Sequence, residues 1–264
     1  MLMHLLFALL ALVFPLCASY PHTDKQRLAV QQIFDAFGLS DPDRECPLLW
    51  IQSGKERWDF DQRFEKRSEE LLPLFQQAGL LDEVLPDKEA YDAILIHGAT
   101  WTALQKRLLF AYELLEKGVQ CRTLVFLGGY RALKDEEKTL DPSLATEMDM
   151  IHWLYLCTPR PEEMTGIEVE FIEGPAVWPN QRATTKDAGM AWLASCPKAR
   201  SCLAISNQPY VEYQQAVLRS LLPEDYELET AGPGVSFTPS VALLLDTLGK
   251  IWITSAPIEG HARR

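Results

Sequence analysis

The chain has 264 residues, of which 47% are hydrophobic, and this is enough to build one generous domain. Its formal net charge of -12 at pH 7 argues against a nucleic-acid partner and against a surface that binds anionic lipid, because like charges repel. A small anionic ligand stays compatible with this charge, since a few arginines can reverse the field inside a cleft.

The first residues carry the only strongly apolar run of the chain. Residues 5–16 are too few to cross a bilayer comfortably, and they resemble the apolar region of a signal peptide. The small residues Ala18 and Ser19 precede a cleavage position before Tyr20, although no Lys or Arg precedes the run. We predict a signal peptide over 1–19, and the alternative is a buried N-terminal helix.

This segment also sets the expected location of the protein. A signal peptide predicts a periplasmic or secreted protein, and a cytoplasmic protein is the alternative. Contact with a membrane is expected only through this segment, if it is not cleaved.

Residues 20–90 are predicted to form a helical N-terminal extension. An amphipathic pattern from Arg27 to Phe37 is stopped by Gly38. A second helical stretch covers 55–77, where Pro73 is expected to kink or end the helix.

From residue 91 onward, short apolar runs alternate with helical patterns. The predicted strands are 93–96, 122–127, 169–172, 203–205 and 226–230. The predicted helices are 102–117, 146–156, 184–195 and 211–221, followed by a helix or strand-like tail over 241–254. The first three helices are expected to open with capping boxes at Thr102, Thr146 and Thr184. This alternation predicts an α/β fold over 91–264, a Rossmann-like three-layer sandwich around a mainly parallel sheet of about five strands.

The six cysteines give no metal-binding pattern. None belongs to a CxxC pair, and the histidines stand alone, so no metal site is expected. Cys121 and Cys202 each open an apolar run and are predicted to be buried thiols. A disulfide between Cys196 and Cys202 is the alternative in an oxidising compartment.

Polar, aromatic and glycine residues gather where the predicted strands end. In a parallel sheet these ends meet at one edge, which is where ligands bind. We expect the ligand-binding residues to be His97, Gly98, Thr100, Arg107, Gly128, Gly129, Arg131, Glu147, Asn180, Arg182, Thr184, Ser206, Asn207 and Tyr210.

Several of these residues have an ordinary structural interpretation as well. Gly128 and Gly129 can present backbone donors to a ligand or form a simple turn. The arginines can hold an anion or pair with acidic neighbours such as Glu137. Thr184 is also explained by a role as a helix cap alone, and Glu147 by a favourable interaction with a helix dipole.

No catalytic set is evident in the sequence. Neither a GxGxxG nor a GxxxxGK[ST] pattern occurs, so classical dinucleotide and P-loop sites are unsupported and the cofactor stays unidentified. Ser206 and His97 are the only candidate nucleophile and base, but Ser206 lacks the GxSxG context. The catalytic residues are therefore left open.

The order of these features resembles the SanA/ElyC/YdcF-like bacterial envelope family, a domain of largely unknown function. The resemblance covers about 91–234 and rests on 92–100, on the helix with Arg107 that ends at Gly118, and on the strand end at Gly128–Gly129. The residues Glu147, Glu173, Thr184–Ala188 and Ile205–Ser206 are similar to further family positions. The resemblance implies a Rossmann-like fold, an envelope setting and a ligand similar to a nucleotide or to S-adenosylmethionine.

The segment after Ser206 departs from the family pattern. The family has an aromatic residue with His and then an Arg, whereas 207–216 contains neither His nor Arg. Two functions are therefore weighed. One is an exported protein, with an envelope-associated enzyme as one form of it, that binds a small anionic, nucleotide- or phosphate-containing ligand. The other is a non-catalytic exported interaction protein, with an aromatic partner surface at Trp50, Trp58, Phe60 and Phe64.

Overall fold

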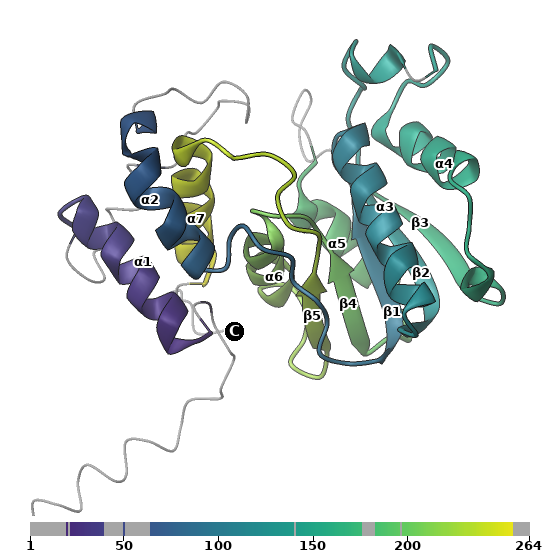
Figure 1. Ribbon diagram of the computed structural model, residues 1–264. Helices are drawn as coiled ribbons and strands as arrows, with labels where there is room; N and C mark the ends of the chain where they lie inside the picture. Colours follow the sequence, from purple (N-terminus) through teal and green to yellow (C-terminus); the bar gives the residue numbers. More distant parts are fainter. Residues whose placement is uncertain are drawn as a thin grey trace, which may run out of the picture.

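The computed structural model describes residues 20, 22–39, 50, 64–139, 141–175, 183–195 and 197–255. At its centre lies one five-stranded sheet in the order β3-β2-β1-β4-β5, in which every neighbouring pair is parallel (Figure 1). The strands are β1 (Ala90–His97), β2 (Gln120–Gly129), β3 (Glu168–Gly174), β4 (Ser201–Ile205) and β5 (Glu227–Ala231).

Helices cover both faces of the sheet, and the alternation of strand side chains assigns each face its own core. On one face α3 (Trp101–Glu116) and α4 (Glu147–Cys157) pack on side chains such as Ile94 and Ile96 of β1. On the other face α5 (Thr185–Ala194) and α6 (Val211–Arg219) pack on Ala93 and Leu95. The predicted α/β three-layer sandwich is confirmed.

A further helical layer stands beside the β5 end of the sheet (Figure 1). It consists of α1 (Asp24–Ala36), α2 (Ser68–Gln77) and α7 (Val241–Ser255), with the short helix η2 (Glu65–Arg67) leading into α2. Phe34, Phe75 and Leu245 share one buried core in this layer. The C-terminal segment, for which helix and strand-like tail were both considered, is thus a helix, and it packs with the N-terminal extension.

Two helix predictions differ from the structure for physical reasons. The predicted capping box at Thr102 is wrong, because α3 begins at Trp101 with Thr100 as N-cap. Pro73 lies inside α2 rather than at its end, where its neighbours Leu71 and Phe75 are fully buried and hold the helix together. The part of the predicted second helix over 55–63 lies outside the described residues.

Other details follow the sequence patterns. The capping boxes at Thr146 and Thr184 are present, and Gly38 takes a positive φ of 68° just after α1. Cys202 is a free buried thiol, and Cys196 lies outside the described residues. Two 3-10 helices, η3 (Glu137–Thr139) and η4 (Glu162–Met164), flank α4 in the chain. Within the described part of the chain, no helix is long and apolar enough to cross a membrane.

Candidate functional site

The strand order creates a switch point between β1 and β4. From β1 the chain builds outward to β2 and β3, and it then returns to place β4 on the other side of β1. The connections after β1 and β4 therefore diverge to opposite faces, and such a divergence is where ligands enter open α/β sheets. The loops after His97 and after Ile205 meet at this point.

Arg107 joins these two loops from within α3. Its side chain is buried, with only 2% exposed. The Nε atom donates to Oδ1 of Asn207 at 2.8 Å, and Nη1 donates to the carbonyl oxygens of His97 at 2.8 Å and Gly98 at 3.0 Å. The guanidinium group thus links the backbone carbonyls at the end of β1 to the loop that follows β4.

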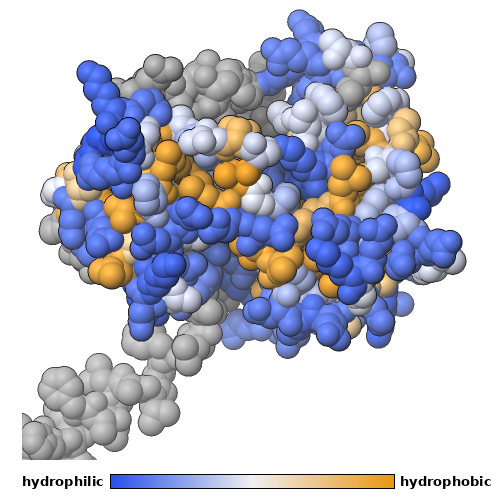
Figure 2. Space-filling view, in the orientation of Figure 1, coloured by the Kyte–Doolittle hydropathy of each residue, from blue (hydrophilic) through white to orange (hydrophobic). Residues whose placement is uncertain are grey.

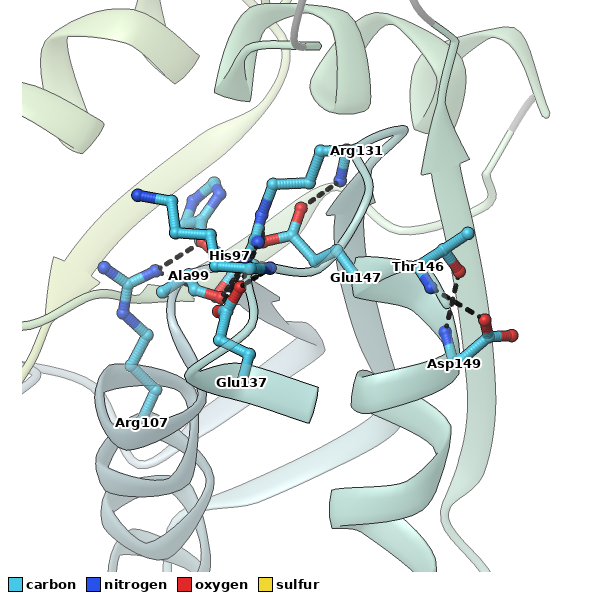
Figure 3. A network of polar contacts seen from close by, with 11 residues as sticks. His97, Ala99, Arg107, Arg131, Glu137, Thr146, Glu147 and Asp149 are labelled. Carbon is cyan, nitrogen blue, oxygen red and sulfur yellow. Dashed lines mark hydrogen bonds and ion pairs between the residues drawn. The ribbon is translucent and has the colours of Figure 1, made fainter. Parts of the chain in front are cut away.

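Arg131, which follows β2, holds the same loop from the other side (Figure 3). Its Nη2 atom donates to the carbonyl oxygen of Ala99 at 2.9 Å. Three successive carbonyl oxygens, those of residues 97–99, therefore accept hydrogen bonds from two buried guanidinium groups. The loop that enters α3 is fixed by charge-assisted hydrogen bonds.

This arrangement leaves the amide groups of the loop available. Among the described residues, none accepts a hydrogen bond from the backbone N–H groups of 99–103, and the first amide bonded in this stretch is that of Leu104, to the Thr100 carbonyl. Consecutive amides at the start of a helix form a concave donor site that favours an anion.

The helices that follow β2 and β3 differ from α3 at their N-termini, because side chains cap them. Thr146 and Asp149 close the N-terminus of α4 with a capping box (Figure 3), and Thr184 and Asp187 do the same for α5. By contrast, neither Thr100 of α3 nor Tyr210 of α6 makes a side-chain capping hydrogen bond. Of the four helices that pack on the sheet, the two whose starts have no side-chain cap are those that flank the switch point.

Arg131 also lies between two buried carboxylates (Figure 3). Its guanidinium bonds both oxygens of Glu137, and Nε lies 3.2 Å from Oε1 of Glu147. Burial is the largest single influence and would raise the pKa of Glu137, but the hydrogen bonds from Arg131 and the Lys134 amide and the positive charges of both residues together hold that pKa below its ordinary value. Arg131 therefore has internal acidic partners and positions the loop.

His97 and Ser206 lie on adjacent strands directly at the switch point. They are 1% and 0% exposed, and neither the Nε2 atom of His97 nor the Oγ atom of Ser206 has a hydrogen-bond partner within the described structure. Burial, helped by the nearby positive charge of Arg107, lowers the pKa of His97 to about 3. The imidazole is neutral at physiological pH and is too weak a base to activate Ser206 well.

The two glycines that end β2, Gly128 and Gly129, have structural roles. A Cβ on Gly128 would come within 2.8 Å of the side chains of Met148 and Ile151 on α4. The amide of Gly129 donates to Oε2 of Glu147 at 2.9 Å, so this predicted donor already has an acceptor. Of the other predicted residues, Thr184 caps α5, and Asn180 and Arg182 lie outside the described residues.

Residues of the N-terminal extension cover the carboxyl edge of the sheet next to the switch point. Nε2 of Gln208 donates to the carbonyl oxygens of Gly79 at 2.8 Å and Asp82 at 2.9 Å. Val84 forms an antiparallel bridge with Gly232, which follows β5. Residues 79–84 therefore cover the ends of β4 and β5, and this wall was not predicted, because no local pattern marks a contact between distant loops.

Two of the four aromatic residues proposed as a partner surface are packed inside the helical layer. Trp50 is 3% exposed and stacks on Phe34, and the ring of Phe64 packs edge-on against Phe37. Trp50 lies in the core of the helical layer and the half-buried Phe64 packs against that core, while Trp58 and Phe60 are outside the described residues.

A separate groove of about 450 Å³ lies between α2 and the segment 235–239. Figure 2 shows hydrophobic residues gathered over this part of the surface. Its walls include Leu72, Leu81 and Phe237, and the Phe237 side chain is 70% exposed. Among the described residues that line this groove none is charged, so it differs in character from the switch point.

Comparison with known proteins adds no identification. No protein-family model matches the chain, and no curated protein is significantly similar to it in sequence. The described residues contain no cluster of three or more His, Cys, Asp or Glu side chains able to hold a metal ion. The function must be argued from the geometry of the site.

Proposed function

We propose that this protein binds a small anionic, phosphate-bearing ligand at the switch point between β1 and β4, with the anion seated on the start of α3. The observation that carries the proposal is the run of backbone N–H groups over 99–103, for which no acceptor exists among the described residues. The first amides of a helix have no partner within the helix, and an anion at the N-terminus bonds them.

The surrounding charges support an anion at this place. Arg107 lies behind the loop, and its positive charge contributes to lowering the pKa of His97. The first turn of α3 has no acidic residue, unlike the first turns of α4 and α5. Arg107 and Arg131 thus favour the anion by shaping the loop rather than by direct contact.

We assign no reaction to this site. The neutral imidazole of His97 is a poor general base, and Glu147 is engaged by Arg131 and by the amide of Gly129. The family resemblance suggests a nucleotide-like ligand, which agrees with a phosphate-bearing compound but rests on sequence features alone.

The test uses a variant that fills the amide site with its own carboxylate. In Thr100→Asp the new side chain is placed at the N-cap of α3, where Asp accepts hydrogen bonds from the following amides. We expect the Kd for inorganic phosphate and for AMP, measured by calorimetry, to rise at least tenfold, while the unliganded variant keeps or gains thermal stability.

The control is Thr23→Asp, the same substitution at the N-cap of α1, which already carries a capping box and is remote from the sheet edge. It changes the net charge equally and should bind like the wild type. Binding of Thr100→Asp at wild-type strength, or no binding of either probe to the wild type at millimolar concentration, would overturn the proposal. The second result would turn attention to the alternative of an interaction protein, with the apolar groove beside Phe237 as its surface.

A further inference from the structure

We infer that the ligand is a phosphorylated sugar or polyol, whose hydroxyl groups are bound by a neutral polar floor next to the anion site. This inference rests on the proposed anion site at the start of α3. The floor consists of His97, Ser206 and Gln214, which are 1%, 0% and 4% exposed. Nε2 of His97, Oγ of Ser206 and Oε1 of Gln214 all lack a hydrogen-bond partner among the described residues.

The sheet register places the first two residues side by side. Ile96 of β1 pairs with Ile205 of β4, so His97 and Ser206 occupy the next positions on adjacent parallel strands. Side chains alternate between the faces, and Leu95 and Ala204, two residues earlier, both lie in the core beneath α5 and α6. His97 and Ser206 therefore point to that same face.

Gln214 reaches this face from α6. Leu218, one turn later in the helix, packs in the core with Cys202 and Ala204 of β4. Because α6 begins at the carboxyl edge of the sheet, Gln214 lies one turn nearer to that edge, toward the end of β4 where Ser206 stands. Three unpartnered polar atoms thus come from three different elements to one face at the switch point.

The rim above this floor is more accessible and adjoins the anion site. Gly98, Thr100, Asn207 and Tyr210 are all half-buried. The guanidinium of Arg107 ties Gly98 to Asn207, which brings the loop with the free amides into contact with the loop above Ser206. A ligand that spans the rim can therefore place a phosphate on one loop and a hydroxyl group against the other.

The chemistry of the floor selects the uncharged part of the ligand. A hydroxyl, an amide and a neutral imidazole offer donors and acceptors without net charge. A second anion is disfavoured there, because a buried charge needs a compensating partner, and a purely apolar group would leave all three atoms unsatisfied. Hydroxyl groups of a sugar both donate and accept hydrogen bonds, and they match this set.

The experiment compares inorganic phosphate with ribose 5-phosphate by calorimetry on the full chain. The wild type should bind ribose 5-phosphate at least tenfold more tightly than phosphate. Ser206→Ala removes one floor hydroxyl and should lower this ratio about fivefold or more while the Kd for phosphate stays unchanged. Ser220→Ala is the matched control at the far end of α6, where the hydroxyl donates to the Val217 carbonyl, and it should keep the wild-type ratio.

The possible outcomes separate the two proposals. If phosphate binds and ribose 5-phosphate binds no more tightly, the polar floor has no ligand role and the anion site alone stands. If the ratio is high but is the same in Ser206→Ala, the assignment of the floor is wrong. If neither compound binds, the anion site and the inference that depends on it both fail. A thermal melt of each variant verifies that the chain is folded in every arm.

Discussion

At the level of single residues, the two buried arginines show how a side chain can serve a site without touching the ligand. Arg107 and Arg131 together bond the carbonyl oxygens of residues 97–99. A carbonyl turned toward a guanidinium leaves the neighbouring amides facing elsewhere, and this determines what the loop can bind. The sequence indicated that both arginines lie near the strand ends. It could not show that they face backbone carbonyls, because that depends on how distant loops meet.

His97 leads to a prediction about acid stability. Its pKa is lowered to about 3 in the folded chain, whereas the unfolded chain titrates near 6.5, so the unfolded state binds the extra proton first. Stability that is present above pH 6.5 should therefore be lost as the pH falls toward 3. Between pH 6.5 and 4.5 we expect the wild type to lose about 2–3 kcal/mol more than His97→Gln, as measured by urea unfolding. Parallel stability curves for the two proteins would contradict a buried neutral imidazole.

At the level of elements, the start of each sheet helix was only partly predictable. The capping boxes of α4 and α5 are local patterns, in which Thr is followed three residues later by Asp, and they are confirmed. The similar pattern at Thr102 is not used, because α3 begins one residue after Thr100. Gln214 gave no signal at all, since a polar residue in mid-helix becomes notable only when tertiary packing buries it.

The junction of β3 and α5 gives a second prediction. A Cβ on Gly174 would lie 2.5 Å from the backbone nitrogen of Ala188, so Gly174→Ala must push α5 away from the sheet. Because the clashing atoms belong to the backbone, we expect a loss of about 2–3 kcal/mol in the free energy of unfolding, measured in urea. Gly166→Ala is the comparison, because that site has open space and only its φ of 87° opposes a side chain, which costs about 1 kcal/mol. Equal losses at both sites would show that α5 yields without strain.

At the level of the whole molecule, the alternation of strands and helices predicted the sheet, whereas the helical layer beside it was predicted only in part. Short-range periodicity reveals α1 and part of α2, but it does not show that α7 completes their core. The same limit applies to the wall of 79–84 over β4 and β5, which depends on Gln208 reaching across the chain.

The contact between the helical layer and the sheet domain gives a third prediction. Nε2 of His22, just before α1, lies 3.0 Å from Oε2 of Glu212 on α6. The hydrogen bond to Glu212 raises the pKa of His22, so its stabilisation is complete below pH 6.5 and is lost as the pH rises through the raised value. Because His22 is partly exposed, we expect His22→Asn to cost about 0.5–1 kcal/mol at pH 6 and nearly nothing at pH 8.5. An equal cost at both pH values would mean that packing, rather than charge, makes this contact.

The position of α7 has a consequence for the order of assembly during synthesis. The helices α1 and α2 leave the ribosome before the strands do, yet the core that buries Phe34 and Phe75 also needs Leu245 of α7, which follows the last strand. The nascent extension must therefore keep an apolar face uncovered while the whole five-stranded sheet is made. Chaperone contacts during translation should concentrate on α1 and α2 until α7 has been made and can bury them.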